Sequence, residues 1–292
     1  MHPGDSVRNL TPGGTVVAAV IVVAVVAAAT ALATGGTVGG PASGDPTATA
    51  SAPSATASAL SPSASATTPD PSTTASPTIA AAARRQGIGQ IRARLTDGQP
   101  LSITVLGDDS SVGDTGWVFL WARDTLGADH TVVYHEYNRT TGGYAAARTL
   151  SSKGPTVDVW NASYLSATAA KDTADLGKLY PQPTDIVILN LGHQDDQATF
   201  DADVTTLWQA VSAKQTPLGL VILQNPETAT TGLQETRMKN LARTADRLGL
   251  PTVDVMKAFT DASVPLTELV IGARPTQQGA QLWAGTVTSA LQ

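Results

Sequence analysis

The chain has 292 residues, a net charge of −6 and no cysteine. The lack of cysteine excludes disulfides, thiolate metal sites and a cysteine nucleophile, and the acidic balance argues against a general nucleic-acid binder. Every tryptophan, tyrosine and phenylalanine lies after Gly116, so the first third of the chain lacks the residues of an ordinary core. The remaining roughly 200 residues are enough for one folded domain.

Residues 15–34 form one uncharged apolar run near the start of the chain. About 20 helical residues at ~1.5 Å each span the ~30 Å hydrocarbon layer of a membrane. We expect a transmembrane anchor here. The alternative is a cleaved signal segment, for which the Ala-Leu-Ala sequence at 31–33 offers a cleavage site. Arg8 precedes the run and no positive charge follows it before Arg84, which predicts a cytoplasmic segment 1–14 and an exported remainder.

Residues 35–78 consist mostly of Ala, Ser, Thr, Pro and Gly, with Asp45 and Asp70 as their only charges. Such a tract buries too little apolar surface to offset its chain entropy, so we expect a disordered linker. The composition changes at Ile79, and the segment RRQGIGQIRARL (84–95) predicts a short basic helix. Its arginines would either contact an anionic lipid or polymer or form a solvated helix face. The folded domain is predicted to cover 79–292.

Beyond this helix the chain alternates short apolar segments with helical ones. The predicted strands are 101–107, 130–137, 156–163, 185–192, 217–224 and 251–256. The predicted helices are 116–127, 167–180, 200–214, 233–249 and 276–292, and 137–149 predicts a hairpin that turns at two adjacent glycines. The alternation predicts an α/β protein, a three-layer α/β/α sandwich with a mainly parallel sheet. In such folds the functional residues follow the carboxyl ends of the strands.

Four polar segments occupy such positions, and together they carry a family resemblance. They are GDDSSVG (107–113), WNASYLSAT (160–168), NLGHQDD (190–196) and IGARPTQQGAQLWA (271–284). Their order and spacing resemble the SGNH/GDSL hydrolases over about 91–292. That family has Gly-Asp-Ser, Gly, Gly-x-Asn-Asp and Asp-x-x-His in these places. The resemblance implies an SGNH-hydrolase or flavodoxin-like fold, with a serine nucleophile, a histidine base oriented by an aspartate, and an oxyanion hole in the family's enzymes.

The catalytic positions implied by this resemblance carry other residues. The nucleophile position falls on Asp109, with Ser110 as the alternative if the turn is shifted by one residue. Both residues can also be interpreted as a helix N-cap. The positions of the family's Asp and His fall on Ile271 and Arg274. Arginine stays protonated and cannot accept a proton, and isoleucine cannot orient an imidazole.

The oxyanion positions are altered as well. They fall on Ser163, in place of a glycine, and on Gln194, in place of an asparagine. A serine still offers a backbone N–H, but a displaced glutamine amide would lose much of the ~10²–10³-fold that such a donor supplies. No histidine lies after His193, which is the candidate for an alternative base. The other interpretation is that His193 packs or caps its loop.

Four carboxylates are expected near one another, because Asp108, Asp109, Asp195 and Asp196 follow two adjacent strands. A Ca²⁺ or Mg²⁺ site is one interpretation, since hard cations bind several carboxylate oxygens. We favour instead an ion pair between Arg274 and Asp109, which satisfies both charges without a metal. No metal or cofactor is expected.

Two functions are consistent with this sequence. The first is a membrane-anchored extracytoplasmic domain that is catalytically degenerate and binds a cell-envelope small molecule or polymer, or a protein partner. The second is an active esterase or acyl hydrolase, acting on a lipid or acylated-carbohydrate ester through Ser110 or Asp109 with a non-standard base. The altered Asp and His positions favour the first function. If the apolar run were a cleaved signal, the domain would be secreted.

Overall fold

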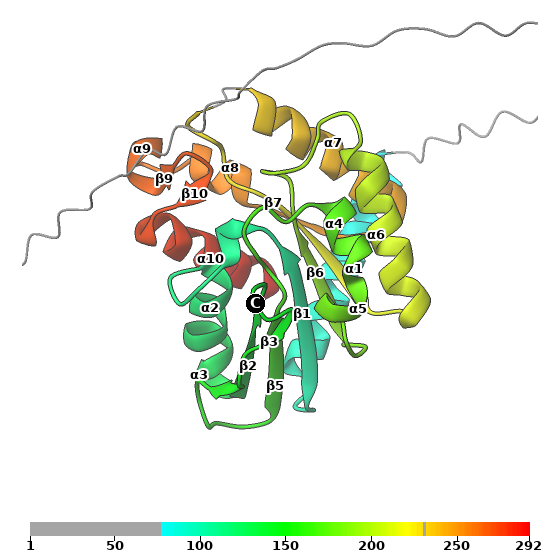
Figure 1. The fold of residues 1–292 in the computed structure, drawn as a ribbon, viewed down its shortest axis with the longest axis vertical. Coiled ribbons are helices and arrows are strands. Elements are labelled where there is room, and N and C mark those ends of the chain that lie inside the picture. Colours follow the sequence, from blue (N-terminus) through cyan, green and yellow to red (C-terminus); the bar gives the residue numbers. More distant parts are fainter. Residues whose placement is uncertain (1–76, 230–231) are drawn as a thin grey trace, which may run out of the picture. The chain divides into compact units, whose positions relative to one another are not determined.

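The structure, a computed structural model, describes residues 77–229 and 232–292 (Figure 1). The expected anchor at 15–34 and almost all of the expected linker at 35–78 lie outside these residues. Within the described ranges, no helix combines the length and apolar character needed to cross a bilayer. The expectations for the N-terminal third therefore stay predictions.

A mainly parallel sheet forms the middle layer, as predicted. Its strands are β1 (Leu101–Gly107), β2 (Thr131–Asn138), β3 (Gly143–Tyr144), β4 (Arg148–Thr149), β5 (Thr156–Asn161), β6 (Ile186–Asn190), β7 (Leu218–Leu223) and β8 (Thr252–Asp254). Their order is β3-β2-β5-β1-β6-β7-β8, with β4 also paired to β2. Only the short β3 and β4 run antiparallel to β2. Val105 of β1 lies opposite Asn161 of β5 and Ile188 of β6, so the carboxyl ends of these strands meet at one edge.

Helices cover both faces of the sheet (Figure 1). One layer contains α1 (Pro77–Thr96), α2 (Trp117–Leu120), the π-helical turn η2 (Trp121–Leu126), α3 (Gly127–Asp129), α8 (Val255–Thr260), α9 (Leu266–Leu269) and α10 (Gln277–Leu291). The other contains α4 (Ala169–Ala174), α5 (Leu176–Leu179), α6 (Phe200–Lys214) and α7 (Leu233–Leu248). All five residues of β6 are buried, as expected for a central strand covered on both faces.

Aromatic side chains fill the first of these two helical layers. The rings of Trp117 and Trp283 stack with centroids 5.7 Å apart, which packs α2 against α10. Trp121 lies 6.4 Å from Trp117, and Phe259 meets Trp283 edge to face at 6.1 Å. All three tryptophans are buried core residues.

Some predicted boundaries were wrong, for local reasons. The predicted helix 116–127 is interrupted by η2, and the predicted helix 167–180 is divided at Asp175. The predicted strand 251–256 ends at Asp254, because the side chain of this residue accepts the N–H of Lys257 at 2.8 Å and caps α8. Helix α1 begins at Pro77, two residues inside the predicted linker.

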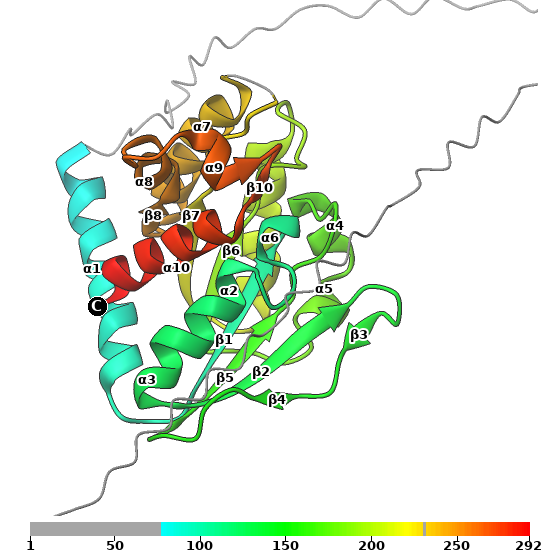
Figure 2. The same cartoon turned by 90° about the vertical axis from the view of Figure 1, so that its left-hand side faces the viewer.

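The arginines described on α1 bind the folded domain. The Nε and Nη2 atoms of Arg92 donate to the carbonyl of Ala290 at 3.1 and 2.9 Å, where α1 packs on α10 (Figure 2). Arg94 contacts Asp97 at 3.0 Å and Asp185 at 3.1 Å. These two side chains therefore dock the helix on the domain, so the prediction of a merely solvated face is wrong for them.

Candidate functional site

The sharp turn after β1 places Asp109 at the carboxyl edge of the sheet. The chain forms the 3₁₀ turn η1 (Asp109–Ser111), and Asp108 is its N-cap, with Oδ1 accepting the N–H of Ser110 at 3.0 Å. A cap was predicted here, but at Asp109 and Ser110, so that interpretation is wrong by one residue. The side chain of Asp109 is thereby left to face another element.

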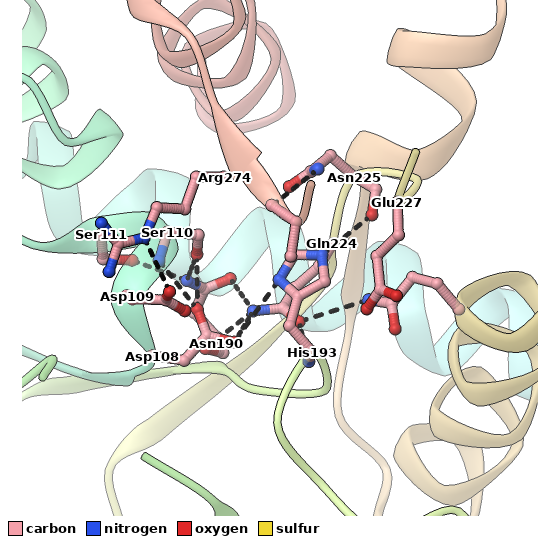
Figure 3. A network of polar contacts seen from close by, with 12 residues as sticks. Asp108, Asp109, Ser110, Ser111, Asn190, His193, Gln224, Asn225, Glu227 and Arg274 are labelled. Atoms are coloured by element: carbon pink, nitrogen blue, oxygen red, sulfur yellow. Dashed lines mark hydrogen bonds and ion pairs between the residues drawn. The ribbon is translucent and has the colours of Figure 1, made fainter. Parts of the chain in front are cut away.

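That element is the hairpin of β9 (Val270–Ile271) and β10 (Arg274–Pro275), which carries Arg274 to η1. The Nε atom of Arg274 lies 2.8 Å from Oδ2 of Asp109 (Figure 3). The Arg274 side chain is 54% exposed and that of Asp109 only 11%. The predicted ion pair is confirmed, and it joins the two positions that the family resemblance assigns to nucleophile and base.

The same hairpin keeps the Asp-x-x-His spacing that the family resemblance implies for an orienting aspartate and a histidine base. Ile271 lies directly opposite Arg274 in the antiparallel register, so the two side chains share one face of the hairpin. The turn between them needs Gly272, whose φ is +66°. Ile271 is 74% exposed and supplies no charge, so the carboxylate that Arg274 contacts comes from η1 rather than from its own hairpin.

Ser110 lies inside the protein rather than at the surface of the site. Its Oγ donates to Oδ1 of Asp108 at 2.7 Å and accepts from Nδ2 of Asn190 at 3.0 Å. The residue is buried, and the structure does not bring its hydroxyl to His193. A substrate ester would have to displace this buried network to reach Ser110, which argues against the alternative nucleophile.

His193 is fully buried between two hydrogen-bond acceptors. Its Nε2 lies 3.1 Å from the carbonyl of Asn225, and its Nδ1 lies 3.5 Å from Oδ2 of Asp108. Burial opposes the charged form, but the Asp108 carboxylate and the Asn225 carbonyl raise the pKa of His193 above 6.5. Both ring nitrogens thus face groups of the protein, and neither is free to take a proton from a substrate. The interpretation of His193 as a loop-packing residue fits this geometry.

Two more buried amide side chains, those of Asn190 and Gln224, complete the network around Asp108 (Figure 3). Sequence reasoning missed both. The Nε2 atom of Gln224 donates to Oδ2 of Asp108 at 2.9 Å and to the carbonyl of Asn190 at 3.1 Å. Its Oε1 accepts the backbone N–H of His193 at 3.0 Å. Although burial opposes ionisation, the contacts with His193, Gln224 and Ser110 lower the pKa of Asp108. The signal that could have found these residues is a polar side chain at the end of a buried apolar strand.

The two predicted oxyanion residues differ in burial and in their partners. The N–H of Ser163 donates to Oδ1 of Asn161 at 3.3 Å, so this donor already has a partner. Gln194 is exposed, and its side chain makes no hydrogen bond with any residue that the structure describes. The assignment of these two positions to an oxyanion hole therefore stays a prediction.

The four carboxylates expected to cluster go to different partners. Asp195 accepts the N–H of Ala169 at 2.8 Å, at the start of α4, and the exposed Asp196 accepts the N–H of Ala198 at 2.8 Å. Asp108 lies against His193, and Asp109 against Arg274. Across 77–229 and 232–292, no group of three potential metal ligands lies close enough together to hold an ion.

No family model and no curated protein sequence matches this chain. Solved structures do match it. A two-domain esterase (CEX) active on acetylated mannans is 17% identical with a TM-score of 0.52, over 70% of this chain and 52% of that chain. The lipase/acylhydrolase from Enterococcus faecalis is 17% identical with a TM-score of 0.49, over 65% and 94%. A putative lipolytic protein of the G-D-S-L family from Desulfitobacterium hafniense is 16% identical with a TM-score of 0.47, over 65% and 99%. The match to the two-domain esterase therefore shows that this protein shares the fold of that enzyme over the matched residues.

Proposed function

We propose that this protein is a catalytically degenerate member of the SGNH/GDSL hydrolases that binds a cell-envelope ligand instead of hydrolysing an ester. The observation that carries the proposal is the 2.8 Å ion pair between Asp109 and Arg274. It occupies the positions at which the family's serine hydroxyl would meet its histidine. A domain that has this fold but lacks that chemistry still presents the carboxyl edge of its sheet as a surface on which a ligand can bind.

Loss of catalysis is expected because ester hydrolysis needs a group that takes up a proton and later returns it. A hydroxyl attacks only as a base removes its proton, and the same base later protonates the leaving group. Arg274 stays protonated at every physiological pH and cannot do either step. His193 is held between Asp108 and Asn225, so it does not replace the missing base.

One contact favours the rival function, an active esterase. The Oγ of Ser110 lies 2.7 Å from the carboxylate of Asp108, which could accept its proton. Burial of both residues argues against it, because a substrate carbonyl must approach the hydroxyl within about 3–3.5 Å. In this rival function, the ester would displace the buried hydrogen bonds around Ser110, and the Ser110 hydroxyl would then attack its carbonyl carbon.

A hydrolysis assay of the full chain separates the two functions. We expect p-nitrophenyl acetate and butyrate to be hydrolysed at the buffer rate by the wild type and by the Asp109→Ala, Ser110→Ala and Arg274→Ala variants. Turnover that is lost in Ser110→Ala and kept in Ser289→Ala, a matched change on the exposed side of α10, would establish the esterase instead. Turnover lost on adding a chelator would contradict the proposal in favour of a metal site.

The proposal includes a location for the domain. The apolar run 15–34 would anchor the chain with the domain outside the cytoplasm, a placement supported by the charge bias around the run. We expect the chain in the membrane fraction, and its domain to be cleaved by protease added to spheroplasts. A domain that is digested only after lysis would contradict the external location, and a chain released without residues 1–33 would indicate secretion.

A further inference from the structure

A hollow of about 860 Å³ opens beside Ser163. Most of its lining residues belong to the end of β2, to the hairpin that leads through β3 towards β4, and to the loop after β5. Figure 2 shows the course of β2, β3 and β4. We propose that this hollow binds an anionic saccharide, a sugar that bears a carboxylate or phosphate. The inference rests on the proposed binding function and names the ligand class that the site would take.

The positive charge of the hollow comes from Arg139. Its second arginine, Arg148, is neutralised, because it contacts Asp114 at 2.7 and 3.0 Å and Glu136 at 3.5 Å. No carboxylate of the described residues lies within ion-pair distance of Arg139, which has only a longer-range attraction to Asp175, although the protein as a whole is acidic. Its guanidinium carbon lies 4.5 Å from the ring centroid of Tyr164, a cation–π contact that holds the group at the wall. A guanidinium without a carboxylate partner matches a carboxylate or phosphate with two parallel hydrogen bonds.

The rest of the lining suits a sugar ring better than an acyl chain. Asn138, Thr140 and Ser163 place amide and hydroxyl groups around the hollow. Ser163 is buried, and its Oγ, which lies beside Gly107, has no hydrogen-bond partner among the described residues, so a ligand group that reached it would meet an unpaired hydroxyl. Leu165, 52% exposed, adds an apolar surface for the C–H face of a ring. The volume falls within the ~300–1,000 Å³ of small-molecule sites.

A strained backbone conformation in the loop after β5 indicates that the surrounding structure imposes the shape of this wall of the hollow. Ser166 has a φ of +61°, the one positive value outside glycine in the described residues. Such a conformation costs about 1–3 kcal/mol and persists only where the surroundings impose it, often at ligand sites. The Nζ of Lys171 donates to the carbonyl of Ser166 at 2.6 Å and fixes the turn that presents Tyr164 and Leu165.

Isothermal titration of the full chain in detergent tests the proposal with four probes. They are trigalacturonate, its uncharged counterpart galactotriose, mannose 6-phosphate and inorganic phosphate. We expect at least one of the two anionic sugars to bind, at least tenfold more tightly than galactotriose and inorganic phosphate. Arg139→Gln should weaken that binding at least tenfold, whereas Arg243→Gln, which removes an exposed arginine of α7, should not change it. Circular dichroism of each variant verifies that it is folded.

The results with the four probes distinguish a carboxylate ligand, a phosphate ligand and a failure of the proposal. Binding of trigalacturonate alone identifies a carboxylate, and binding of mannose 6-phosphate alone identifies a phosphate. The proposal is overturned if no probe binds, if galactotriose or inorganic phosphate binds as tightly as the acidic sugars, or if folded Arg139→Gln binds unchanged. Ester hydrolysis by a protein that binds these sugars would overturn the proposed loss of catalysis and leave this inference standing.

Discussion

Two oppositely charged side chains occupy positions where the related enzymes are expected to hold a hydroxyl and an imidazole. Asp109 and Arg274 lie 165 positions apart in sequence, yet their side chains meet at 2.8 Å. This contact could be predicted because each position is fixed by neighbours, the glycines of the first segment and Pro275 and Gly279 of the last. Since Arg274 is half exposed, the pair contributes only about 0–1 kcal/mol to stability. Its main consequence is chemical, because Arg274 stays protonated and cannot act as the base that the family resemblance implies at its position.

A second charge pair, between Asp108 and His193, carries more of the free energy of unfolding because both side chains are fully buried. We expect Asp108→Asn to destabilise the protein by about 3–5 kcal/mol, the usual cost of removing one partner of a buried pair. Without the carboxylate, only the Asn225 carbonyl and Glu227 still oppose the effect of burial, so the pKa of His193 should fall. Ring chemical shifts followed by NMR against pH measure this pKa in both proteins.

The raised pKa of His193 determines how its contribution to the stability of the fold changes with pH. Its contribution to stability is complete below the unfolded-state pKa of about 6.5 and is lost as the pH rises through the folded-state pKa. Ser110→Ala is the control, because it removes a contact of Asp108 but not its charge. A wild-type His193 that titrates below 6.5, or a pKa of His193 that does not fall in Asp108→Asn, would contradict the effect of Asp108 on this ring.

The inward position of His193 shows why sequence reasoning could not establish this pair. It depends on Gly192, whose φ is +145° and where an added Cβ would lie 2.5 Å from the Cε of Met238. Such a backbone turn is not encoded by the polarity of its neighbours. Gln224 was missed for a similar reason, since a polar residue after a strand faces inward or outward depending on the local backbone.

At the scale of single elements, helix α4 begins on a buried carboxyl group. Asp195 accepts the N–H of Ala169, and burial, strengthened by the nearby Asp108 and Asp203, raises the pKa of Asp195 to about 7. Because this value lies above the unfolded-state pKa of 3.8, the contribution is complete at acid pH and is lost as the pH rises from about 4 to about 7. The raised pKa of Asp172, also buried in α4, acts in the same direction.

We therefore expect Asp195→Asn to be more stable, relative to the wild type, at pH 8 than at pH 4.5. The amide still accepts the N–H of Ala169 but carries no charge at either pH. Urea unfolding at the two pH values measures the difference, and Asp196→Asn, at the exposed neighbour, should show no such change. Equal effects of Asp195→Asn at both pH values would contradict the protonated state of this residue.

The success of element prediction differed between strands and helices. Strands such as β6 and β7 were predicted within two residues, because continuous apolar runs between polar ends leave little choice. The helix after β1 was predicted unbroken, since its apolar spacing is nearly regular, but η2 interrupts it. Helix α8 was missed because Asp254 serves both as the end of β8 and as a helix cap.

At the scale of the molecule, the fold brings residues of all four polar segments to one edge of the sheet, where several of them make contacts that the family resemblance does not imply. The three-layer architecture follows from the alternation of strands and helices and was predicted. The exposed or buried direction of Ser110, His193 and Gln194 was not, because it is decided by packing among distant segments. An anchored, external domain remains a prediction from residues 1–78.

The most direct test of this account is the p-nitrophenyl acetate turnover of the full chain carrying Asp109→Ser, Ile271→Asp and Arg274→His together. The positions retain their contacts and register, so we expect the triple variant to hydrolyse the ester at least tenfold faster than the wild type, which should stay at the buffer rate. The variant with Asp109→Ser and Ile271→Asp, which keeps Arg274, should stay at that rate as well. A wild type that already turns over as fast as the triple variant, or a folded triple variant that remains inert, would contradict an SGNH site whose catalytic pair has been replaced by an ion pair.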